Sequence, residues 1–526
     1  MKHSPQLTNG ESAKWAQTQC SDRAAIAASQ RADLVRGRRT THEAAKPGAL
    51  ARLLALGIMG LAFGGTAAFR VLGDSTSAAA RPNFIFILID DLGWTDLGCF
   101  GSTFYETPRI DRLAAEGMRF TNAYAACTVC SPTRAAILTG KYPARLHLTD
   151  WIPGHVRKNA RLLIPDWTQY LALEEVTLAE ALRPAGYVCG HVGKWHLGNE
   201  SYYPQRQGFD VNIAGDRWGS PASYFWPYGT KARRVPLDGG SPGEYLTDRL
   251  TDEAIDFIRK HRDRPFFLYL AHYAVHTPLQ AKPELVAKYE KKLAGGAGGE
   301  QRCAVYAAMI ESVDQSVGRI VDALRQLQLD QRTVIFFTSD NGGLTLPACR
   351  GQPVTCNAPL RAGKGSAYEG GVRVPLIVWW PRTIPPGGVS HTPVISTDFY
   401  PTILQLAGLS SDPARQTDGE NLVPLLRRTG SLRREAIYWH YPHYHPGGAT
   451  PYGAVRAGEF RLIEFYEDGR IELYNLANDV GEKQDLSKTQ PDRARSLQRL
   501  LHQWRKSVGA QMPSGNPNVD AGSPAR

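Results

Sequence analysis

The chain has 526 residues, 42% of them hydrophobic, so it exceeds one ordinary domain and has a globular composition. We expect a large α/β unit with a smaller appended part. The net charge is +11, but residues 1–81 carry 11 Lys/Arg against 5 Asp/Glu, so the remainder holds only +5. This modest charge suits an anionic substrate and argues against a nucleic-acid partner. The eight cysteines show neither zinc-type spacing nor a dense disulfide framework.

The N-terminal region has the pattern of an export signal. Residues 1–48 are polar and basic, and residues 53–69 carry no charge and end among small residues suited to cleavage. We expect residues 1–80 to be a leader and the mature protein to be periplasmic or extracellular, in contact with a membrane only during export. Arg38-Arg39 is a weak hint of twin-arginine export. An uncleaved anchor is the competing interpretation, because the uncharged run barely suffices to span a bilayer.

Residues 83–89 form an apolar run that predicts a strand buried on both faces of a parallel sheet. Asp90 and Asp91 follow it directly, where open α/β sheets bind ligands. Two adjacent carboxylates repel each other unless a cation lies between them. A solvated turn is the alternative.

Cys130 stands just before a predicted helix. Pro132 suits the first helical turn, and the next residues favour a helix as far as Gly140. The N–H groups at a helix start favour an anion, and Arg134, one turn on, adds a fixed cation. The alternative is a small buried cysteine beside an ordinary helix.

Residues 187–198 combine a cation with an imidazole. The first half of this stretch predicts a strand, and in an extended continuation Lys194 and His196 would point the same way. Such a pair suits an anionic transition state. We interpret His191, on the strand itself, as structural.

Residues 265–278 predict a second buried strand that runs into a loop containing His276. A lone histidine beside proline is more often a surface or hydrogen-bonded histidine than a catalytic one. His272 has the weaker claim to a role in chemistry.

Residues 303–329 repeat apolar side chains at helical spacing and predict a long helix against the sheet. The helix leads to a buried strand at residues 333–337, followed by Asp340 and Asn341. With the two aspartates after the first strand, these side chains make an all-oxygen ligand set. Such a set selects Ca²⁺ or Mg²⁺ over zinc.

Lys364 lies between two glycines and can therefore approach a ligand closely. A point charge near a bridging oxygen stabilises a departing alkoxide. Glu369 and Arg373 we interpret as structural partners of each other. Cys349 and Cys356 bracket a short loop and could form a disulfide in an oxidising compartment, or stay as two thiols.

Two loop-like stretches, residues 150–166 and 199–249, lack a periodic pattern. The second contains a group of aromatic residues, namely Trp218, Tyr224, Phe225, Trp226 and Tyr228. Loops at the carboxyl edge of a sheet usually set specificity, and aromatic faces stack on sugars or aryl rings. The same aromatics could equally fill a satellite core.

The C-terminal part changes character. Residues 460–466 and 471–474 flank an Asp468-Gly469 turn, which predicts a hairpin and a small antiparallel subdomain. A helix from Pro491 to about Val508 follows. We therefore divide the mature chain into an α/β catalytic domain, a C-terminal subdomain and a disordered tail, at residues 81–430, 431–508 and 509–526.

In their order and spacing, six of these motifs resemble those of the type I, formylglycine-dependent sulfatases, over about residues 82–490. The motifs are Asp90-Asp91, Cys130-x-Pro-x-Arg134, Gly-Lys194-x-His196-Leu-Gly, His276, Asp340-Asn341 and Lys364-Gly. No catalytic residue of the family is replaced. The resemblance implies an alkaline phosphatase-like fold, in which a large, mostly parallel sheet is flanked by helices.

The resemblance also implies the chemistry. Cys130 would be converted by a formylglycine-generating enzyme to formylglycine (3-oxoalanine), whose gem-diol attacks sulfur to give a covalent sulfo-enzyme intermediate. A divalent ion, usually Ca²⁺ with Mg²⁺ possible, would contact the converted residue. The implied metal ligands are Asp90, Asp91, Cys130, Asp340 and Asn341. The implied residues that balance the sulfate charge are Arg134, Lys194 and Lys364. His276, with Lys364, would stabilise or protonate the leaving alcohol, and His196 would be the base of the second step.

We therefore expect an exported sulfatase that acts on a sulfated small molecule, with carbohydrates favoured and aryl sulfates as surrogates. The family's C-terminal subdomain closes one side of the cleft, so His440, His443 and His445 are candidate substrate contacts; a metal scavenger or a packed loop is the alternative. Two other functions stay open. One is a phosphonate or phosphodiester hydrolase of the same superfamily, and the other is a binder of sulfated polysaccharide without catalysis.

Overall fold

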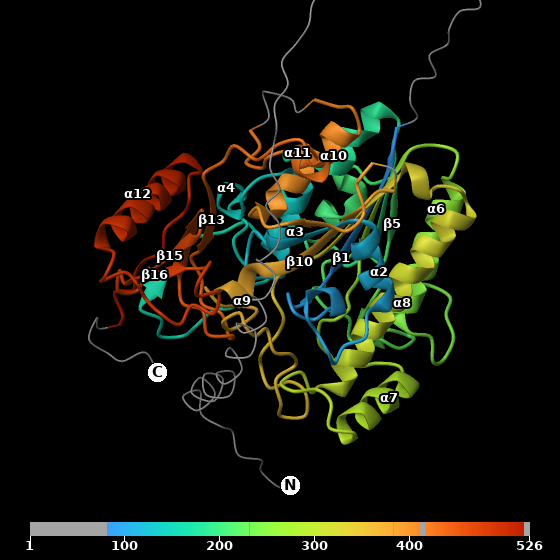
Figure 1. Ribbon diagram of the computed structural model, residues 1–526, viewed down its shortest axis with the longest axis horizontal. Helices are drawn as coiled ribbons and strands as arrows, with labels where there is room; N and C mark the ends of the chain where they lie inside the picture. Colours follow the sequence, from blue (N-terminus) through green and yellow to red (C-terminus); the bar gives the residue numbers. More distant parts are fainter. Residues whose placement is uncertain (1–80, 231, 382, 411–415, 520–526) are drawn as a thin grey trace, which may run out of the picture. The chain divides into compact units, whose positions relative to one another are not determined.

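The computed structural model describes residues 81–230, 232–381, 383–410 and 416–519 (Figure 1). The predicted leader, residues 1–80, lies outside the described residues. Within the described ranges, no helix combines the length and apolar character needed to cross a membrane.

A nine-stranded sheet forms the centre of the α/β part. Its strand order is β11-β2-β10-β9-β1-β8-β4-β5, with β12 also pairing with β2. The strand bounds are β1 (Asn83–Ile89), β2 (Met118–Tyr124), β4 (Val188–Gly193), β5 (Val211–Ile213), β8 (Phe266–Ala271), β9 (Thr333–Ser339), β10 (Arg373–Trp379), β11 (Gly388–Ser390) and β12 (Val394–Ile395). The strands from β9 to β5 run parallel, whereas β10 is antiparallel to both its neighbours. The mostly parallel sheet expected from the sequence is confirmed.

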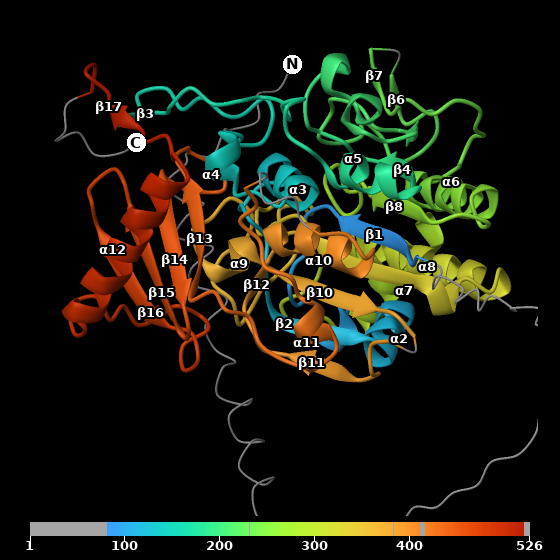
Figure 2. The ribbon, with the colours of Figure 1, turned by 90° about the horizontal axis from the view of Figure 1, so that it is seen from above.

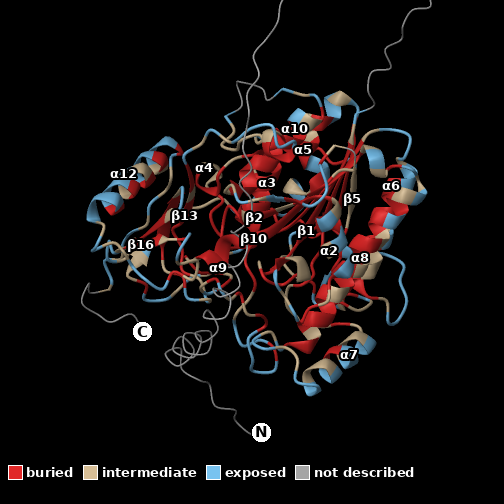
Figure 3. Cartoon of the chain, in the orientation of Figure 1, coloured by how far each residue is buried: buried red, intermediate tan, exposed pale blue. Residues whose placement is uncertain are grey.

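Helices cover both faces of this sheet (Figures 1 and 3). Alternate side chains of β1 therefore point into two different cores. Ile85 and Ile87 pack with the layer of α2, α6 and α8, and Phe84 and Phe86 pack with the layer of α3, α5 and α10. The helices are α2 (Pro108–Glu116), α3 (Cys130–Thr139), α4 (Pro143–Leu146), α5 (Leu178–Leu182), α6 (Leu246–Lys260), α7 (Pro283–Ala294), α8 (Ala304–Gln326), α9 (Glu369–Val372), α10 (Phe399–Leu406) and α11 (Val423–Leu426). The long helix predicted before the Asp340 strand is α8.

Several short elements connect these layers. Single 3₁₀ turns lie at Gly98–Phe100, Arg183–Ala185, Glu200–Tyr202, Pro204–Gln207, Asp330–Arg332 and Ser396–Asp398. The stretch predicted as a long loop after residue 199 contains a small hairpin of β6 (Gly229–Thr230) and β7 (Arg233–Arg234).

The C-terminal part contains a separate four-stranded antiparallel sheet with α12 (Pro491–Ser507) against it (Figure 2). Its strands are β13 (Ala436–Tyr441), β14 (Tyr452–Ala457), β15 (Phe460–Phe465) and β16 (Ile471–Asn475). The Gly469 N–H donates to the Phe465 carbonyl in the predicted turn between β15 and β16. The antiparallel sheet is confirmed, and a domain boundary near residue 430 stays a prediction.

The tail differs from the prediction of disorder from residue 509. Residues 510–519 follow a defined path, and β17 (Ser514–Gly515) pairs with β3 (Leu162–Leu163) in the first of the two predicted loops. The Asn516 N–H also donates to the Arg161 carbonyl over 2.9 Å. Backbone pairing with a distant loop gives order to a polar segment whose composition carries no strand signal, so the prediction is wrong up to residue 519. Residues 520–526 lie outside the described residues.

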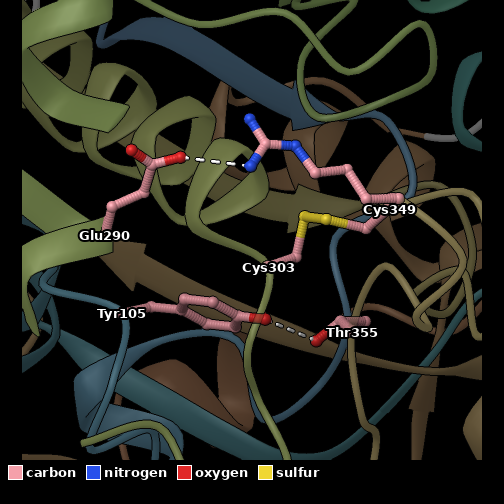
Figure 4. Close-up of a disulfide and its surroundings, with 6 residues drawn as sticks. Tyr105, Glu290, Cys303, Cys349 and Thr355 are labelled. Atoms are coloured by element: carbon pink, nitrogen blue, oxygen red, sulfur yellow. Dashed lines mark hydrogen bonds and ion pairs between the residues drawn. A yellow bond between two sulfur atoms is a disulfide. The ribbon is translucent and has the colours of Figure 1, made fainter. Parts of the chain in front are cut away.

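The disulfide also differs from the prediction. Cys349 bonds to Cys303, which precedes α8, with a Cα–Cα distance of 6.0 Å, so pairing with Cys356 is wrong (Figure 4). The partner lies 46 residues away in the sequence, where no local pattern indicates it. Two further contacts hold the same loop. Arg350 pairs with Glu290 of α7 over 3.3 Å, and the Thr355 hydroxyl lies 3.1 Å from that of Tyr105.

Removing this disulfide should destabilise the protein, because the bridge closes a long loop of the unfolded chain. We expect Cys349→Ser to lower the free energy of unfolding by about 2–4 kcal/mol. Cys356→Ser, outside the bridge, is the control and should change it by less than about 0.5 kcal/mol. Urea unfolding and peptide mapping without reductant measure both effects, and a mapped Cys349–Cys356 peptide would contradict the assignment.

Candidate active site

Four buried polar side chains meet at the carboxyl ends of two neighbouring strands. Asp90 and Asp91 follow β1, and Asp340 and Asn341 follow β9. The two strands are parallel and pair in register as far as Ile89 opposite Ser339, so both polar pairs leave the sheet at the same edge. All four residues are at most 1% exposed. The structure therefore brings together the acid cluster that the sequence predicts.

Three cations, of which Arg134 and Lys194 are fully buried and Lys364 is partly buried, balance the three carboxylates. Lys194 Nζ lies 2.6 Å from Asp90 Oδ2, and Lys364 Nζ lies 2.6 Å from Asp91 Oδ1. Arg134 donates from Nε and Nη2 to Asp340 Oδ2 over 2.9 and 2.7 Å. Each cation comes from a different part of the chain, namely the end of β4, the loop before α9 and the first turns of α3. A buried charge is costly unless it is paired, so these contacts are what make the acid cluster tolerable in the core.

Cys130 is the first residue of α3 and lies against His196, with 3.4 Å between Sγ and Nδ1. Burial raises the pKa of its thiol, although Lys194 and Lys364 act in the opposite direction. The unmodified side chain is therefore a neutral thiol at neutral pH and a poor nucleophile.

His196 presents an unprotonated nitrogen to Cys130. Its Nε2 lies 2.5 Å from the Ile152 carbonyl, which can only accept, so Nε2 carries the proton and Nδ1 is the base. Burial and Lys194 hold the pKa of His196 well below its usual range. The strand ends at Gly193, and His196 itself has a φ of 58°. Lys194 and His196 thus reach one corner through a left-handed turn and not, as predicted, through an extended continuation.

His276 faces the acid cluster more closely than the sequence indicated. Its Nδ1 donates to the Thr277 carbonyl over 2.7 Å, so the unprotonated Nε2 points at Asp91 Oδ2 from 3.7 Å. Burial lowers the pKa of His276 to about 3, helped by Lys364. Two acceptors that face each other at this distance indicate room for a shared cation. With Asp90 and Asp91, His276 forms a group whose potential ligand atoms lie within 4.8 Å of one another.

The donor set fits a hard divalent cation. Asp90 Oδ1 and Asn341 Oδ1 are buried and lack a hydrogen-bond partner among the described residues. Burial raises the pKa of Asp90 to about 8, and Asp340 adds to this. Burial would raise the pKa of Asp91 too, but Lys364 and His276 hold it below its usual range. Unsatisfied oxygens beside repelling carboxylates are what Ca²⁺ or Mg²⁺ binds.

Comparison with known proteins decides the family. The sulfatase family model matches residues 82–409, and the model for the C-terminal part of N-sulphoglucosamine sulphohydrolase matches residues 363–508. The chain belongs to the sulfatase family. It is therefore a sulfuric ester hydrolase of the alkaline phosphatase superfamily.

Individual sulfatases are similar over most of the chain. A sulfatase of Formosa agariphila is 33% identical over 506 residues, which cover 81% of this chain and 89% of its own. Human N-acetylgalactosamine-6-sulfatase is 37% identical over 389 residues, 69% of each chain. The crystal structure of Ps i-CgsB in complex with k-i-k-neocarrahexaose has a TM-score of 0.68 at 31% identity and covers 83% of this chain and 94% of that one.

The other histidines near these motifs have structural partners. His191 Nδ1 lies 3.2 Å from Asn212 Oδ1, and His272 Nε2 lies 3.1 Å from Ser316 Oγ. Glu369 and Arg373 form the predicted ion pair over 3.3 Å. None of these contacts reaches the acid cluster.

Four of the aromatic residues of the stretch 199–249 belong to a hydrophobic core. Tyr224 and Tyr228 are fully buried, and Phe225 and Trp226 pack against the same core, which is the large core on the α2, α6 and α8 face of the central sheet and not a separate satellite core. Trp218 is half-buried with the guanidinium groups of Arg217 and Arg233 over its ring. The next residue, Gly219, touches His196, because a Cβ there would lie 2.4 Å from Cε1 of that ring.

Loss of the Arg134 guanidinium should strongly destabilise the sulfatase. Arg134→Ala leaves Asp340 buried without the two N–H donors that its Oδ2 accepts, and we expect the free energy of unfolding to fall by about 3–5 kcal/mol. Arg134→Lys keeps the charge but not the fork, so its loss should be smaller. Urea unfolding in the presence of a chelator measures both variants, and equal stability of Arg134→Ala and wild type would contradict the pairing.

Proposed function

We propose that this sulfatase is exported and hydrolyses a sulfate ester of a carbohydrate. The observation that carries the chemistry is the position of Cys130, whose thiol contacts His196 and whose pKa responds to Lys194, Lys364, Asp90 and Asp340. A potential nucleophile thus shares one buried corner with a candidate metal site and with cations suited to sulfate. The leader pattern of residues 1–80 supports export, and an uncleaved anchor remains compatible with it.

The names of the relatives support a carbohydrate substrate. One relative is named for N-acetylgalactosamine 6-sulfate, and Ps i-CgsB is described in complex with a neocarrahexaose. Neither name specifies which sugar or which sulfate position this enzyme accepts. Maturation of Cys130 would require a formylglycine-generating enzyme as a partner.

Formylglycine derived from Cys130 would supply a hydrated aldehyde hydroxyl as nucleophile, and one Ca²⁺, with Mg²⁺ as the alternative, would supply Lewis-acid polarisation of the sulfate. The proposed ligands are Asp90, Asp91, Asp340 and Asn341, with residue 130 beside them. Each has a buried oxygen in the acid cluster or, for residue 130, a side chain at its edge.

The remaining residues would bind the anion and move protons. Lys194, Lys364 and Arg134 provide fixed positive charge for the sulfate group. His196 holds an unprotonated Nδ1 at residue 130 and can accept a proton there. Lys364 and His276 lie together at Asp91, on the side where we place the leaving alcohol. Lys364 would stabilise or protonate the alcohol, and His276 would do so once its unprotonated Nε2 has taken up a proton.

Conversion of Cys130 is tested by activity and by mass. Protein made together with a formylglycine-generating enzyme should hydrolyse 4-nitrophenyl sulfate and should contain an aldehyde in the Cys130 peptide. Cys130→Ala should lose activity by at least about a thousandfold, as expected for a nucleophile. Cys127→Ala, also buried and three residues earlier, is the matched control and should stay active.

Full activity of Cys130→Ala would contradict this mechanism. Faster turnover of a phosphonate or phosphodiester analogue than of the sulfate ester would favour the alternative hydrolase. An unconverted thiol in protein that binds sulfated polysaccharide but hydrolyses nothing would favour the binder.

The cation is tested by thermal unfolding as well as by activity. A chelator should abolish hydrolysis, and Ca²⁺ at 100 times its dissociation constant should stabilise the fold by about 2.7 kcal/mol. Asp340→Asn should reduce that Ca²⁺-dependent shift. Asp418→Asn removes a carboxylate that pairs with Arg145 outside the site, and it should keep the full shift. A shift that survives in Asp340→Asn would place the cation elsewhere.

A further inference from the structure

The loop between β13 and β14 directly contacts the loop before α9 that contains Lys364, which we call the lysine loop. The Ala449 N–H donates to the Gly365 carbonyl over 3.0 Å, next to Lys364. The ring of His445 lies on Gly365, because a Cβ there would be 1.8 Å from His445 Nδ1. Gly365 also has a φ of +73°, so this position needs glycine for both its backbone and its contact.

Hydrogen bonding fixes which nitrogen of His445 carries the proton. The Gly447 N–H donates to Nδ1 over 2.9 Å, so Nδ1 is an acceptor and the proton of the neutral ring sits on Nε2. Nε2 has no hydrogen-bond partner among the described residues, and part of its surface is accessible to solvent. Burial and Lys364 lower the pKa of His445 to about 3, so the ring is neutral at neutral pH.

The two neighbouring histidines offer no nitrogen to a ligand. His440 uses both ring nitrogens, with the Tyr466 hydroxyl at 2.8 Å and the Gln511 carbonyl at 2.9 Å. His443 Nε2 lies 2.8 Å from Thr149 Oγ1, and its Nδ1 has no hydrogen-bond partner among the described residues but is fully buried. Of the three histidines predicted as substrate contacts, His445 alone has an unpartnered ring nitrogen that is not fully buried.

The position of this donor determines which part of a substrate it can contact. Lys364 and His276 meet at Asp91, where the proposed function puts the leaving alcohol, and the pKa of His445 responds to both Lys364 and Asp91. His445 therefore lies beside Lys364, on the side where the proposed function places the alcohol.

We propose that His445 Nε2–H donates a hydrogen bond to an oxygen of the sugar ring beside the sulfated carbon, which makes His445 a specificity-determining residue. This inference rests on the proposed function and deepens it. A flat aryl sulfate without neighbouring hydroxyl groups offers this donor no acceptor. The residue should therefore matter for sulfated sugars and matter little for aryl sulfates.

Two amide substitutions separate the donor from the loop-shaping acceptor. In His445→Gln the side-chain amide reaches the place of Nε2 and can donate there, but the acceptor for the Gly447 N–H is lost. In His445→Asn the amide reaches the place of Nδ1 and can accept from Gly447, but the donor is lost. The measurement is kcat/KM of each mature enzyme on 4-nitrophenyl sulfate and on the sulfated monosaccharide, from a panel that includes N-acetylgalactosamine 6-sulfate, that wild type turns over fastest.

We expect His445→Asn to lose about ten- to a hundredfold in kcat/KM on the sugar, because a substrate oxygen and a site lose their hydrogen bond. Its kcat/KM on 4-nitrophenyl sulfate should change by less than about threefold, and His445→Gln should retain most of the activity on the sugar. A purely structural role would reverse the two variants or lower both substrates equally, and would overturn the inference.

The proposed function can fail separately. If wild type hydrolyses 4-nitrophenyl sulfate but no sugar of the panel, the carbohydrate assignment is wrong and the inference falls with it. If wild type hydrolyses a sugar and the two variants behave alike on both substrates, only the role of His445 is wrong.

Discussion

The site depends on the mutual neutralisation of three buried carboxylates and the three cations that pair with them. Asp90, Asp91 and Asp340 converge because β1 and β9 are parallel neighbours in register. Each is joined to one cation over less than 3 Å. Desolvation of an isolated carboxylate costs several kcal/mol, so this corner of the fold can exist only if the chain segments with the cations also close around it. The contacts that set the geometry of the site are therefore also contacts that the folded α/β part requires.

The pairing also explains why the lysines are poised for an anion. Lys194 pairs with Asp90, and Lys364 pairs with Asp91. The same cluster contains the unpartnered oxygens of Asp90 and Asn341. Where a divalent cation neutralises those carboxylates, the lysine charges become available to a sulfate. With fewer cations, a buried carboxylate would have no partner. With fewer carboxylates, the site could bind sulfate without a metal. The balance of the two sets suits the corner to the cation and the anion of the proposed function.

The sequence predicted those parts of the site that local pattern controls. Continuous apolar runs identify β1 and β9, and parallel strands that end in polar residues bring Asp90 and Asp340 to one edge. Contacts between distant segments left no such pattern. The carbonyl of Ile152 sets the tautomer of His196 from 44 residues away, and His276 approaches Asp91 through a loop without regular structure. Cys303 and the tail strand β17 were missed for the same reason, since each partner lies far along the chain.

The C-terminal sheet is connected to the catalytic corner by buried charge as well as by the His445 loop. Arg461 of β15 lies 3.4 Å from Glu369 and 2.8 Å from Glu482, and Glu369 begins α9 directly after the Lys364 loop. Glu482 accepts a hydrogen bond from the Glu369 N–H over 2.7 Å, and burial raises its pKa to about 7. The lysine loop is thus held at one end by this cluster and in its middle by the bond from Ala449 to Gly365. Because both supports come from the C-terminal part, a change in its loop at Ala449 can shift the position of Lys364. The C-terminal part therefore fixes the position of a charge that the proposed reaction uses, while its loop presents the group that we propose to select the substrate.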